Sequence, residues 1–240
     1  MLIRAQNLVY GALLLALFEC AAAAGAQDVN PAAEKAAQFG TIEGTVTYHP
    51  TASRPWRYAR YYVKNAKSGA LAEAVVAIRG KALKQPNSAA PATTKIDQKN
   101  FQFLPETVAI RVGDSVTFTN SDQAAHNVRS SGELAKFNAT MSVGGPGYTV
   151  RFDRAGGVRR PLEVGCVFHS SMRAWIFVFD HPFYKVTPAD GRFRFVDIPP
   201  GEYDLEMIHS AGALRWRQRV EVRSGETVRA EIRVTPDNIK

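Results

Sequence analysis

The fold class is decided by the stretch Thr107-Val108-Ala109-Ile110-Arg111-Val112-Gly113-Asp114-Ser115-Val116-Thr117-Phe118-Thr119-Asn120. Apolar and polar residues alternate on both sides of Gly113-Asp114. A period of two places successive side chains on opposite faces of a strand, so the stretch predicts two strands with one buried face each. Glycine and aspartate between two such runs indicate a turn. We therefore expect a β-hairpin here.

Most of the chain after residue 41 has the same character, with short alternating runs between turn signals and no long stretch of helical period. The run Ala174–Phe179 differs because it is continuously apolar, as expected for a strand with both faces covered. Further strands are expected around Tyr148–Phe152, Phe193–Phe195, Tyr203–Met207, Val220–Val222 and Val228–Val234. The sequence therefore predicts an all-β protein of sandwich type.

The first 26 residues have the pattern of a secretory signal peptide. Arg4 precedes an apolar run, Leu8 to Phe18, and a small-residue stretch that ends at Ala26 follows. The apolar run is too short to span a bilayer, and no other segment is apolar for long enough. We expect cleavage after Ala26 and a periplasmic or secreted chain without an integral membrane segment. A lipoprotein is disfavoured because Glu19, not a small residue, precedes Cys20.

Cleavage would remove Cys20 and leave Cys166 as the one remaining cysteine. A lone thiol in an oxidising compartment is a liability unless it has a use, and His169 and Met172 follow it closely. Imidazole, thiolate and thioether form a soft donor set that favours copper over calcium or magnesium. His126, on a neighbouring loop, supplies a second imidazole. Two imidazoles and a thiolate can form a trigonal plane with the thioether as a weak axial ligand, which suits both cuprous and cupric ions.

The remaining histidines, His49, His181 and His209, have no such company, and we interpret them as structural or surface groups. Met141 and Met207 are interpreted as core residues, since methionine commonly fills apolar interiors.

The formal net charge is +8 at pH 7, and the signal peptide removes one arginine and one glutamate, so the balance survives cleavage. In an exported protein this charge favours acidic partner proteins or anionic surfaces over nucleic acid, or it serves solubility alone. Basic and aromatic residues also interleave between Arg54 and Lys64. Export argues against single-stranded nucleic acid there. Two interpretations remain: a solvated hairpin whose rings cover the copper-binding part, or a surface that docks a partner.

Four further motifs accompany the Cys166–Met172 loop: Pro105-Glu106-Thr107-Val108, Val112-Gly113-Asp114, Val116-Thr117-Phe118-Thr119-Asn120 and His126-Asn127-Val128. With these motifs, residues 95–181 resemble a cupredoxin, the blue-copper family of plastocyanin, pseudoazurin and amicyanin. The resemblance implies a Greek-key β-sandwich that binds one type 1 copper through His126, Cys166, His169 and Met172. It also implies that Asn127 joins the two ligand loops by hydrogen bonds, and that the exposed edge of His169 is the electron port.

Two positions depart from the family pattern. Amicyanin-type loops carry a proline and a bulky apolar residue between the last histidine and the methionine, whereas this chain has Ser170-Ser171. We therefore expect a weaker apolar docking patch. Most relatives have an aromatic residue two positions before the cysteine, where this chain has Val164 followed by Gly165. Neither departure removes a ligand.

The flanking motifs Gly44-Thr45-Val46, Ala74–Ile78, Thr187–Phe193 and Pro199–Tyr203 resemble successive strands of a carboxypeptidase regulatory-like, transthyretin-type β-sandwich. We expect this smaller sandwich to be split by the inserted cupredoxin, with a string of separate modules as the alternative. Exported bacterial proteins of this layout are often called plastocyanin-like or methylamine-utilisation proteins. The expected organisation is a signal peptide at 1–26, a flexible segment at 27–40, the split sandwich at 41–81 and 182–236, a linker at 82–94 and the cupredoxin at 95–181.

The resemblance favours a carrier of single electrons between an exported dehydrogenase and a c-type cytochrome or an oxidase, with an acidic partner expected. The alternative is a copper-binding or copper-delivery protein without redox traffic. A copper enzyme ranks last, because multicopper oxidases join two copper centres through a histidine on each side of the cysteine. Here Gly165 and Val167 flank Cys166. We therefore expect a protein that is not an enzyme.

Overall fold

The computed structural model describes residues 38–83 and 90–238. The expected signal peptide at 1–26 lies outside these residues, as does most of the expected flexible segment at 27–40. Of the expected linker at 82–94, residues 84–89 also lie outside. Strand β3 (Thr93–Lys99) begins inside that expected linker, because Thr93 pairs with Ser115 of a neighbouring strand. No helix in the described part of the chain is both long and apolar enough to cross a membrane.

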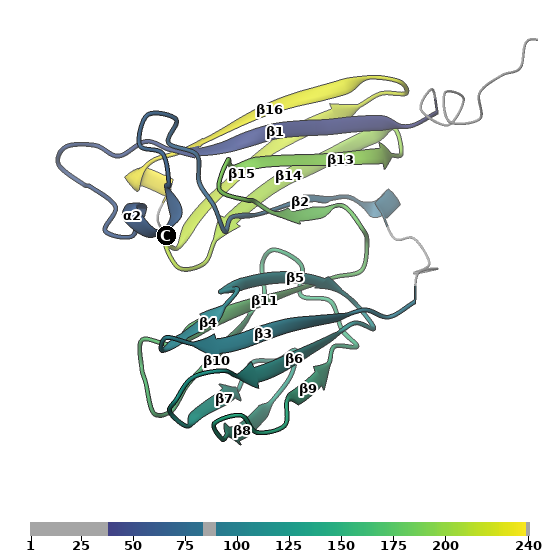
Figure 1. Cartoon of the computed structure of the whole chain (residues 1–240). Coiled ribbons are helices and arrows are strands. Elements are labelled where there is room, and N and C mark those ends of the chain that lie inside the picture. The colour runs from purple at the N-terminus through teal and green to yellow at the C-terminus, as the bar shows by residue number, and fades with distance from the viewer. Residues whose placement is uncertain (1–37, 84–89, 239–240) are drawn as a thin grey trace, which may run out of the picture.

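Two β-sandwiches lie one above the other in Figure 1. In the upper one, strands from both ends of the chain form a sheet of order β13-β1-β16 and a facing sheet of order β12-β2-β14-β15. Its strands are β1 (Gly40–Tyr48), β2 (Val75–Arg79), β12 (Tyr184–Val186), β13 (Arg192–Ile198), β14 (Gly201–His209), β15 (Leu214–Val222) and β16 (Thr227–Val234). This pairing is compatible with a middle part of the chain that is inserted into the upper sandwich. The expected domain boundaries stay a prediction.

The upper sandwich also contains short helical segments. Helix α2 (Ala59–Tyr62) lies in the connection between β1 and β2, η1 (Lys81–Leu83) follows β2, and η2 (Pro236–Asn238) follows β16. The basic and aromatic run from Arg54 to Lys64 is therefore a loop with one helical turn rather than an extended hairpin. The rings of Trp56 and Tyr62 are buried in the upper core, where they stack with their centroids 5.7 Å apart.

The lower sandwich is built from strands between residues 93 and 179. Its sheets have the orders β5-β11-β10-β7-β8 and β4-β3-β6-β9. The remaining strands are β4 (Gln102–Leu104), β5 (Thr107–Arg111), β6 (Ser115–Asn120), β7 (His126–Ser130), β8 (Phe137–Met141), β9 (Tyr148–Arg151), β10 (Leu162–Gly165) and β11 (Arg173–Phe179). Since both bodies consist of strands packed in facing sheets, the expected all-β fold class is confirmed.

The hairpin expected around Gly113-Asp114 is wrong. Strand β5 pairs in parallel with β11, and β6 pairs in parallel with β3, so the two strands belong to different sheets. Val108 and Val116 both enter the same core, but from opposite sides of the sandwich. The turn is held by Asp114, whose carboxylate accepts the backbone N–H of Ala92 and of Arg111. Alternation correctly predicted two half-buried strands, but it does not distinguish pairing from stacking across a core.

Strand β11 has both faces covered, as its continuous apolar sequence predicts. Ala174, Ile176 and Val178 lie in the core of the lower sandwich. The intervening side chains Trp175, Phe177 and Phe179 lie in a second apolar cluster, together with residues of the upper sandwich, Val75, Ala77 and Ile208. One strand therefore contributes to two cores, and the two sandwiches share an apolar interface.

Polar contacts border this interface. The Tyr62 hydroxyl donates a hydrogen bond to Oε2 of Glu106 at 2.5 Å, and the backbone N–H of Thr107 donates to Oε2 of Glu73 at 3.0 Å. Arg159 donates to Oε1 of Glu206 at 2.7 Å. Burial raises the pKa of both Glu73 and Glu106. Each contact joins one sandwich to the other, so they fix the relative position of the two bodies.

Candidate metal centre

Three of the four candidate ligands meet at one end of the lower sandwich. His126 is the first residue of β7, Cys166 follows the last residue of β10, and His169 lies in the loop between β10 and β11. Strands β7 and β10 are neighbours in one sheet, paired at Arg129 and Gly165. The pairing brings the start of one strand beside the end of the other, because antiparallel neighbours run in opposite directions.

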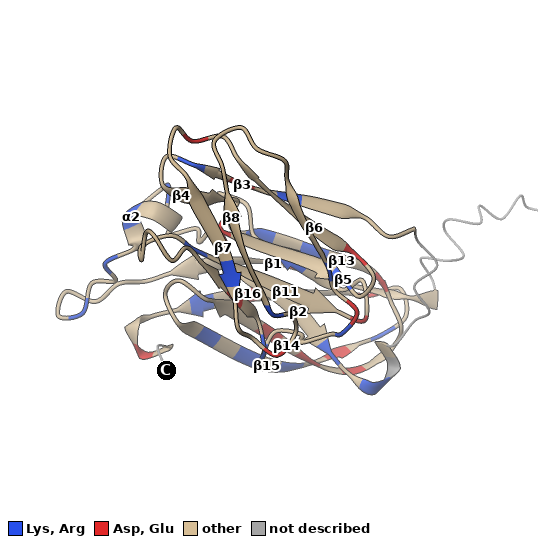
Figure 2. Ribbon diagram, turned by 90° about the horizontal axis from the view of Figure 1, so that it is seen from below, with Lys and Arg blue, Asp and Glu red and all other residues tan. Residues whose placement is uncertain are grey.

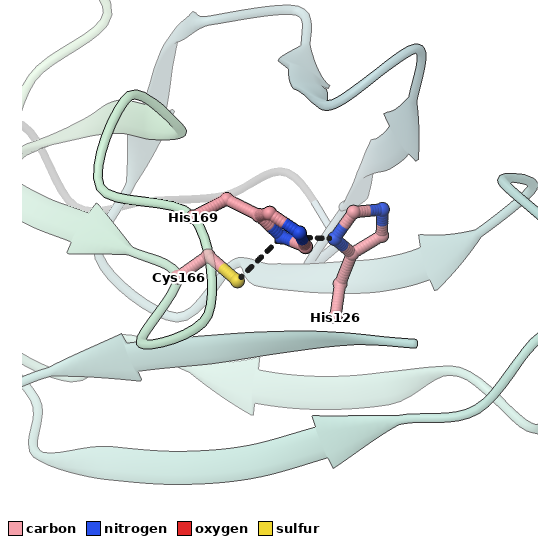
Figure 3. A group of neighbouring side chains, drawn as sticks. All are labelled: His126, Cys166 and His169. Carbon is pink, nitrogen blue, oxygen red and sulfur yellow. Dashed lines mark hydrogen bonds between the residues drawn. The ribbon is translucent and has the colours of Figure 1, made fainter. Parts of the chain in front are cut away.

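The donor atoms of His126, Cys166 and His169 all lie within 4.8 Å of one another. Nδ1 of His126 is 3.1 Å from Nδ1 of His169, and Sγ of Cys166 is 3.7 Å from that same nitrogen (Figure 3). An ion about 2.0 to 2.3 Å from each nitrogen and sulfur would hold trigonal donors roughly 3.5 to 4 Å apart. The spacing fits one small ion between the three side chains. Two imidazoles and a thiol are the donors that copper and zinc prefer.

Burial differs among the three. His126 is fully buried and Cys166 nearly so, whereas His169 is partly exposed. The site therefore has a closed side toward the core and an open side at His169. An ion held there would be shielded from solvent and yet lie one imidazole ring away from it.

Met172 lies at the base of the same loop. Its backbone N–H donates to the carbonyl of His169 at 3.0 Å, and its own carbonyl accepts the N–H of Cys166 at 3.3 Å. The Met172 side chain is 1% exposed and belongs to the same core cluster as Cys166. The loop thus closes on itself with its sulfur-bearing ends together and buried. The role of Met172 as an axial ligand stays a proposal.

Asn127 does join the two ligand-bearing segments, but through its backbone. Its N–H donates to Sγ of Cys166 at 3.3 Å. Its side-chain amide instead donates to Oδ1 of Asn138 at 2.8 Å and to the carbonyl of Ala139 at 3.1 Å, both in β8. The N–H bond to sulfur would stabilise a thiolate, and the side chain fixes the strand that carries His126.

Sequence reasoning missed Asp122. Its Oδ2 lies 2.8 Å from Nε2 of His126, and its carboxylate also accepts the backbone N–H of Asn100 at 3.1 Å and of Phe101 at 2.8 Å. The bond from the Phe101 N–H is the largest cause of a lowered Asp122 pKa, and the contact with His126 lowers it further. The one available signal was an acid four residues before a candidate ligand in a short turn.

The open side of the site is ringed by apolar side chains. The ring of Phe101 packs edge-on against His169, with centroids 4.9 Å apart. Phe101, Val167 and Phe168 are 49%, 52% and 54% exposed. Ser170-Ser171 led us to expect a weak apolar patch, but the loop residues before His169 and the β3–β4 turn supply one. The expectation considered only Ser170-Ser171, whereas Val167 and Phe168 lie in the same loop and Phe101 is distant in sequence.

The other histidines lie apart from this cluster. His209 is buried in the upper sandwich against Trp56 and Tyr62, and burial lowers its pKa to about 3. His181 packs against Phe179, and burial also lowers its pKa. His49 is exposed beside Thr47.

The comparison with protein families selects this same part of the chain. Residues 90–178 match the family model of copper binding proteins, plastocyanin/azurin family. All four candidate ligands lie inside the matched residues, which supports the cupredoxin part of the expectation and copper as the metal. The regulatory-like character of the flanking strands stays a prediction. None of the curated proteins matches the chain significantly.

Solved cupredoxin structures are similar to part of the chain. Amicyanin from Paracoccus versutus (Thiobacillus versutus) is 20% identical over 43% of this chain and 97% of its own, with a TM-score of 0.32. A reduced amicyanin mutant is 21% identical over 43% of this chain and 98% of its own, with a TM-score of 0.32. The purple cupredoxin from Nitrosopumilus maritimus is 23% identical over 36% of this chain and 99% of its own, with a TM-score of 0.30. At these identities and TM-scores the likeness carries no conclusion about function.

Proposed function

We propose that this chain is an exported type 1 copper protein that transfers single electrons between redox partners. One copper would be held by His126, Cys166 and His169, with the thioether of Met172 as a fourth, weaker ligand. The observation that carries the proposal is the convergence of two imidazoles and one thiol within 4.8 Å, inside the segment that matches the copper-binding family. When bound, the copper supplies a one-electron couple between its cuprous and cupric states.

The surroundings of the donors favour electron transfer over turnover of a substrate. Nε2 of His126 hydrogen-bonds to the carboxylate of Asp122, and the Cys166 sulfur accepts the backbone N–H of Asn127. Both donors are therefore fixed in place and need not rearrange when the charge of the ion changes. His169 is the partly exposed donor, and its ring edge is the route by which an electron would leave. The exposed patch of Phe101, Val167 and Phe168 around it offers an apolar contact for a partner.

The proposed partners are an exported dehydrogenase that donates electrons and a c-type cytochrome that accepts them, in the periplasm or outside the cell. A chain that both partners meet in turn needs a small, transient interface, and three exposed apolar side chains around one histidine are of that scale. The flanking sandwich would then hold the copper domain in a fixed orientation through the apolar interface at β11.

The test is to add one equivalent of cupric ion to the full chain and record its optical spectrum. We expect an intense blue thiolate-to-copper band that is absent from Cys166→Ser and retained in His181→Gln, a matched histidine control outside the cluster. Met172→Leu should keep the colour and raise the reduction potential, because the weak thioether stabilises the cupric state. A bound but pale cupric ion, with no reversible one-electron couple in voltammetry, would instead support copper binding or delivery without electron transfer.

A further inference from the structure

A strongly basic segment of the upper sandwich lies near the metal end of the lower one. Between Thr51 and Ala72 the chain has five cations and no acid. Arg54 pairs with Asp237. Arg57, Arg60, Lys64 and Lys67 are exposed, and none of the ion pairs found in the described part of the chain includes them. We call residues 57–67 the basic segment; Figure 2 colours its cations blue on the loops around α2.

Two of these cations are held in place by tyrosine rings. The guanidinium of Arg57 lies 4.5 Å from the ring centroid of Tyr58 and donates a hydrogen bond to its hydroxyl. The guanidinium of Arg60 lies 4.6 Å from the ring of Tyr61 and bonds to that hydroxyl in the same way. Such stacking reduces the side-chain entropy that a partner must remove on binding. Arginine and tyrosine are also the residues that most often dominate protein–protein contacts.

The basic segment and the ligand loop face each other across a cavity of about 810 Å³. Arg57, Tyr61 and Lys64 line one side of this cavity, and Gln102, Ser170 and Ser171 line the other. Gln102 follows Phe101, the residue whose ring packs on His169. In Figure 1, α2 and β4 accordingly lie at the same end of the two sandwiches. The cations thus lie across the cavity from segments of the β3–β4 turn and of the ligand loop, the same turn and loop that carry the apolar patch.

We propose that the basic segment is the electrostatic part of a docking surface for an acidic protein, which would place its acidic side chains on Arg57, Arg60 and Lys64 while it covers the apolar patch. Opposite charges steer such an encounter and set its orientation. A protein fits better than nucleic acid or an anionic membrane, because Glu73, Glu106 and Glu163 also line the cavity. These carboxylates repel a continuous run of phosphates, whereas a protein can place neutral or basic groups opposite them. The partner is a redox partner only if the proposed function holds.

The test uses the full, copper-free chain and a fluorescently labelled peptide in which eight glutamates alternate with serine, with binding measured by anisotropy at low ionic strength. The variant Arg57→Gln/Arg60→Gln/Lys64→Gln should bind the peptide about tenfold more weakly, since each exposed ion pair contributes modestly. The difference should vanish as salt screens the charges. The matched control Arg215→Gln/Arg217→Gln/Arg233→Gln removes the same charge from exposed positions on β15 and β16, and should change affinity less than twofold. Equal losses in both variants would show that net charge alone binds the peptide and would overturn the proposal.

Two further probes separate the classes of partner. An oligonucleotide of eight thymidines and vesicles of phosphatidylglycerol are titrated under the same conditions. If either binds more tightly than the peptide and depends on the same three cations, the surface recognises phosphates and the acidic-protein assignment is wrong. Peptide binding is measured without copper, so the two proposals can fail separately. If the triple variant loses peptide binding but the native chain shows no blue band when copper is added, only the proposed function is contradicted. A blue protein whose triple variant binds like the native chain would contradict this docking surface alone.

Discussion

Oδ2 of Asp122 lies 2.8 Å from Nε2 of His126, and the same carboxylate accepts N–H bonds from the turn between β3 and β4. A carboxylate at neutral pH only accepts hydrogen bonds, so Nε2 of His126 carries the proton and Nδ1 is left free. That free nitrogen is the one that points toward His169 and Cys166 (Figure 3). Asp122 therefore sets which nitrogen of the buried imidazole is available to a metal.

Replacing Asp122 with asparagine should weaken metal binding about tenfold or more, because an amide neither fixes the tautomer nor raises the basicity of the imidazole as a carboxylate does. The reduction potential of the copper form should rise for the same reason. Competition against a chelator measures the affinity, with Asp97→Asn as the control. Asp97 lies in β3, beside the strand that precedes Asp122. Its carboxylate accepts hydrogen bonds from the hydroxyls of Thr119 and Ser121 rather than contacting His126. An unchanged affinity in Asp122→Asn would show that the imidazole is oriented without it.

Phe177→Ala should lower the free energy of unfolding by about 3 to 5 kcal/mol, the usual cost of a cavity left by a buried phenylalanine. Phe177 is fully buried between the two sandwiches, so the loss should destabilise both. Denaturant titration measures the effect. Phe168→Ala, at a side chain that is 54% exposed, is the control and should change stability by less than about 0.5 kcal/mol. Similar costs for the two variants would mean that the apolar interface contributes little.

Tyr62→Phe should cost about 1 to 3 kcal/mol, because it leaves the half-buried carboxylate of Glu106 without the hydroxyl that donates to it. Burial raises the pKa of Tyr62, and the adjacent Glu106 raises it further, so the phenol stays protonated and remains a donor. Tyr61→Phe removes an exposed hydroxyl from the same helix and serves as the control. Thermal or denaturant unfolding of both variants gives the comparison, and equal stability of Tyr62→Phe and the native chain would contradict it.

The buried His209 should make the chain less stable in mild acid. Its pKa is lowered from 6.5 to about 3 by burial, so between these values the unfolded chain binds a proton that the folded chain does not. Stability is then complete above about pH 6.5 and falls by about 1.4 kcal/mol for each pH unit well inside that window. His209→Gln should flatten this dependence, and His49→Gln, at an exposed position, is the control.

Two half-buried carboxyl groups act in the opposite direction on stability. Burial raises the pKa of Glu73 and of Glu106. At a pH between the ordinary and the raised pKa, the folded chain holds a proton that the unfolded chain has lost, so these groups stabilise the fold as the pH falls through that range. Comparison of single histidine variants over one pH series therefore isolates the part due to His209. If His209→Gln and the native chain show the same slope of unfolding free energy against pH, the imidazole is not kept neutral by burial.

The closeness of Cys166 and His169 could be predicted from local sequence. Cys166 and His169 lie on one short loop, and an isolated thiol with a nearby imidazole is informative by its chemistry alone. Asp122 and Phe101 could not be assigned roles in the same way. Their positions depend on the turn between β3 and β4 lying against the end of β7, and no spacing along the chain reports that contact.

The alternation of apolar and polar residues by itself determined that the chain forms half-buried strands, and the continuous apolar run at β11 determined that one strand has two covered faces. Which strands pair was decided only by the tertiary structure. The strands that contain Val108 and Val116 have the same alternation of apolar and polar residues, yet they lie in facing sheets. The physical reason is that side-chain period specifies the face a strand buries, whereas pairing depends on backbone hydrogen bonds to segments distant in sequence, which any strand of suitable length can form.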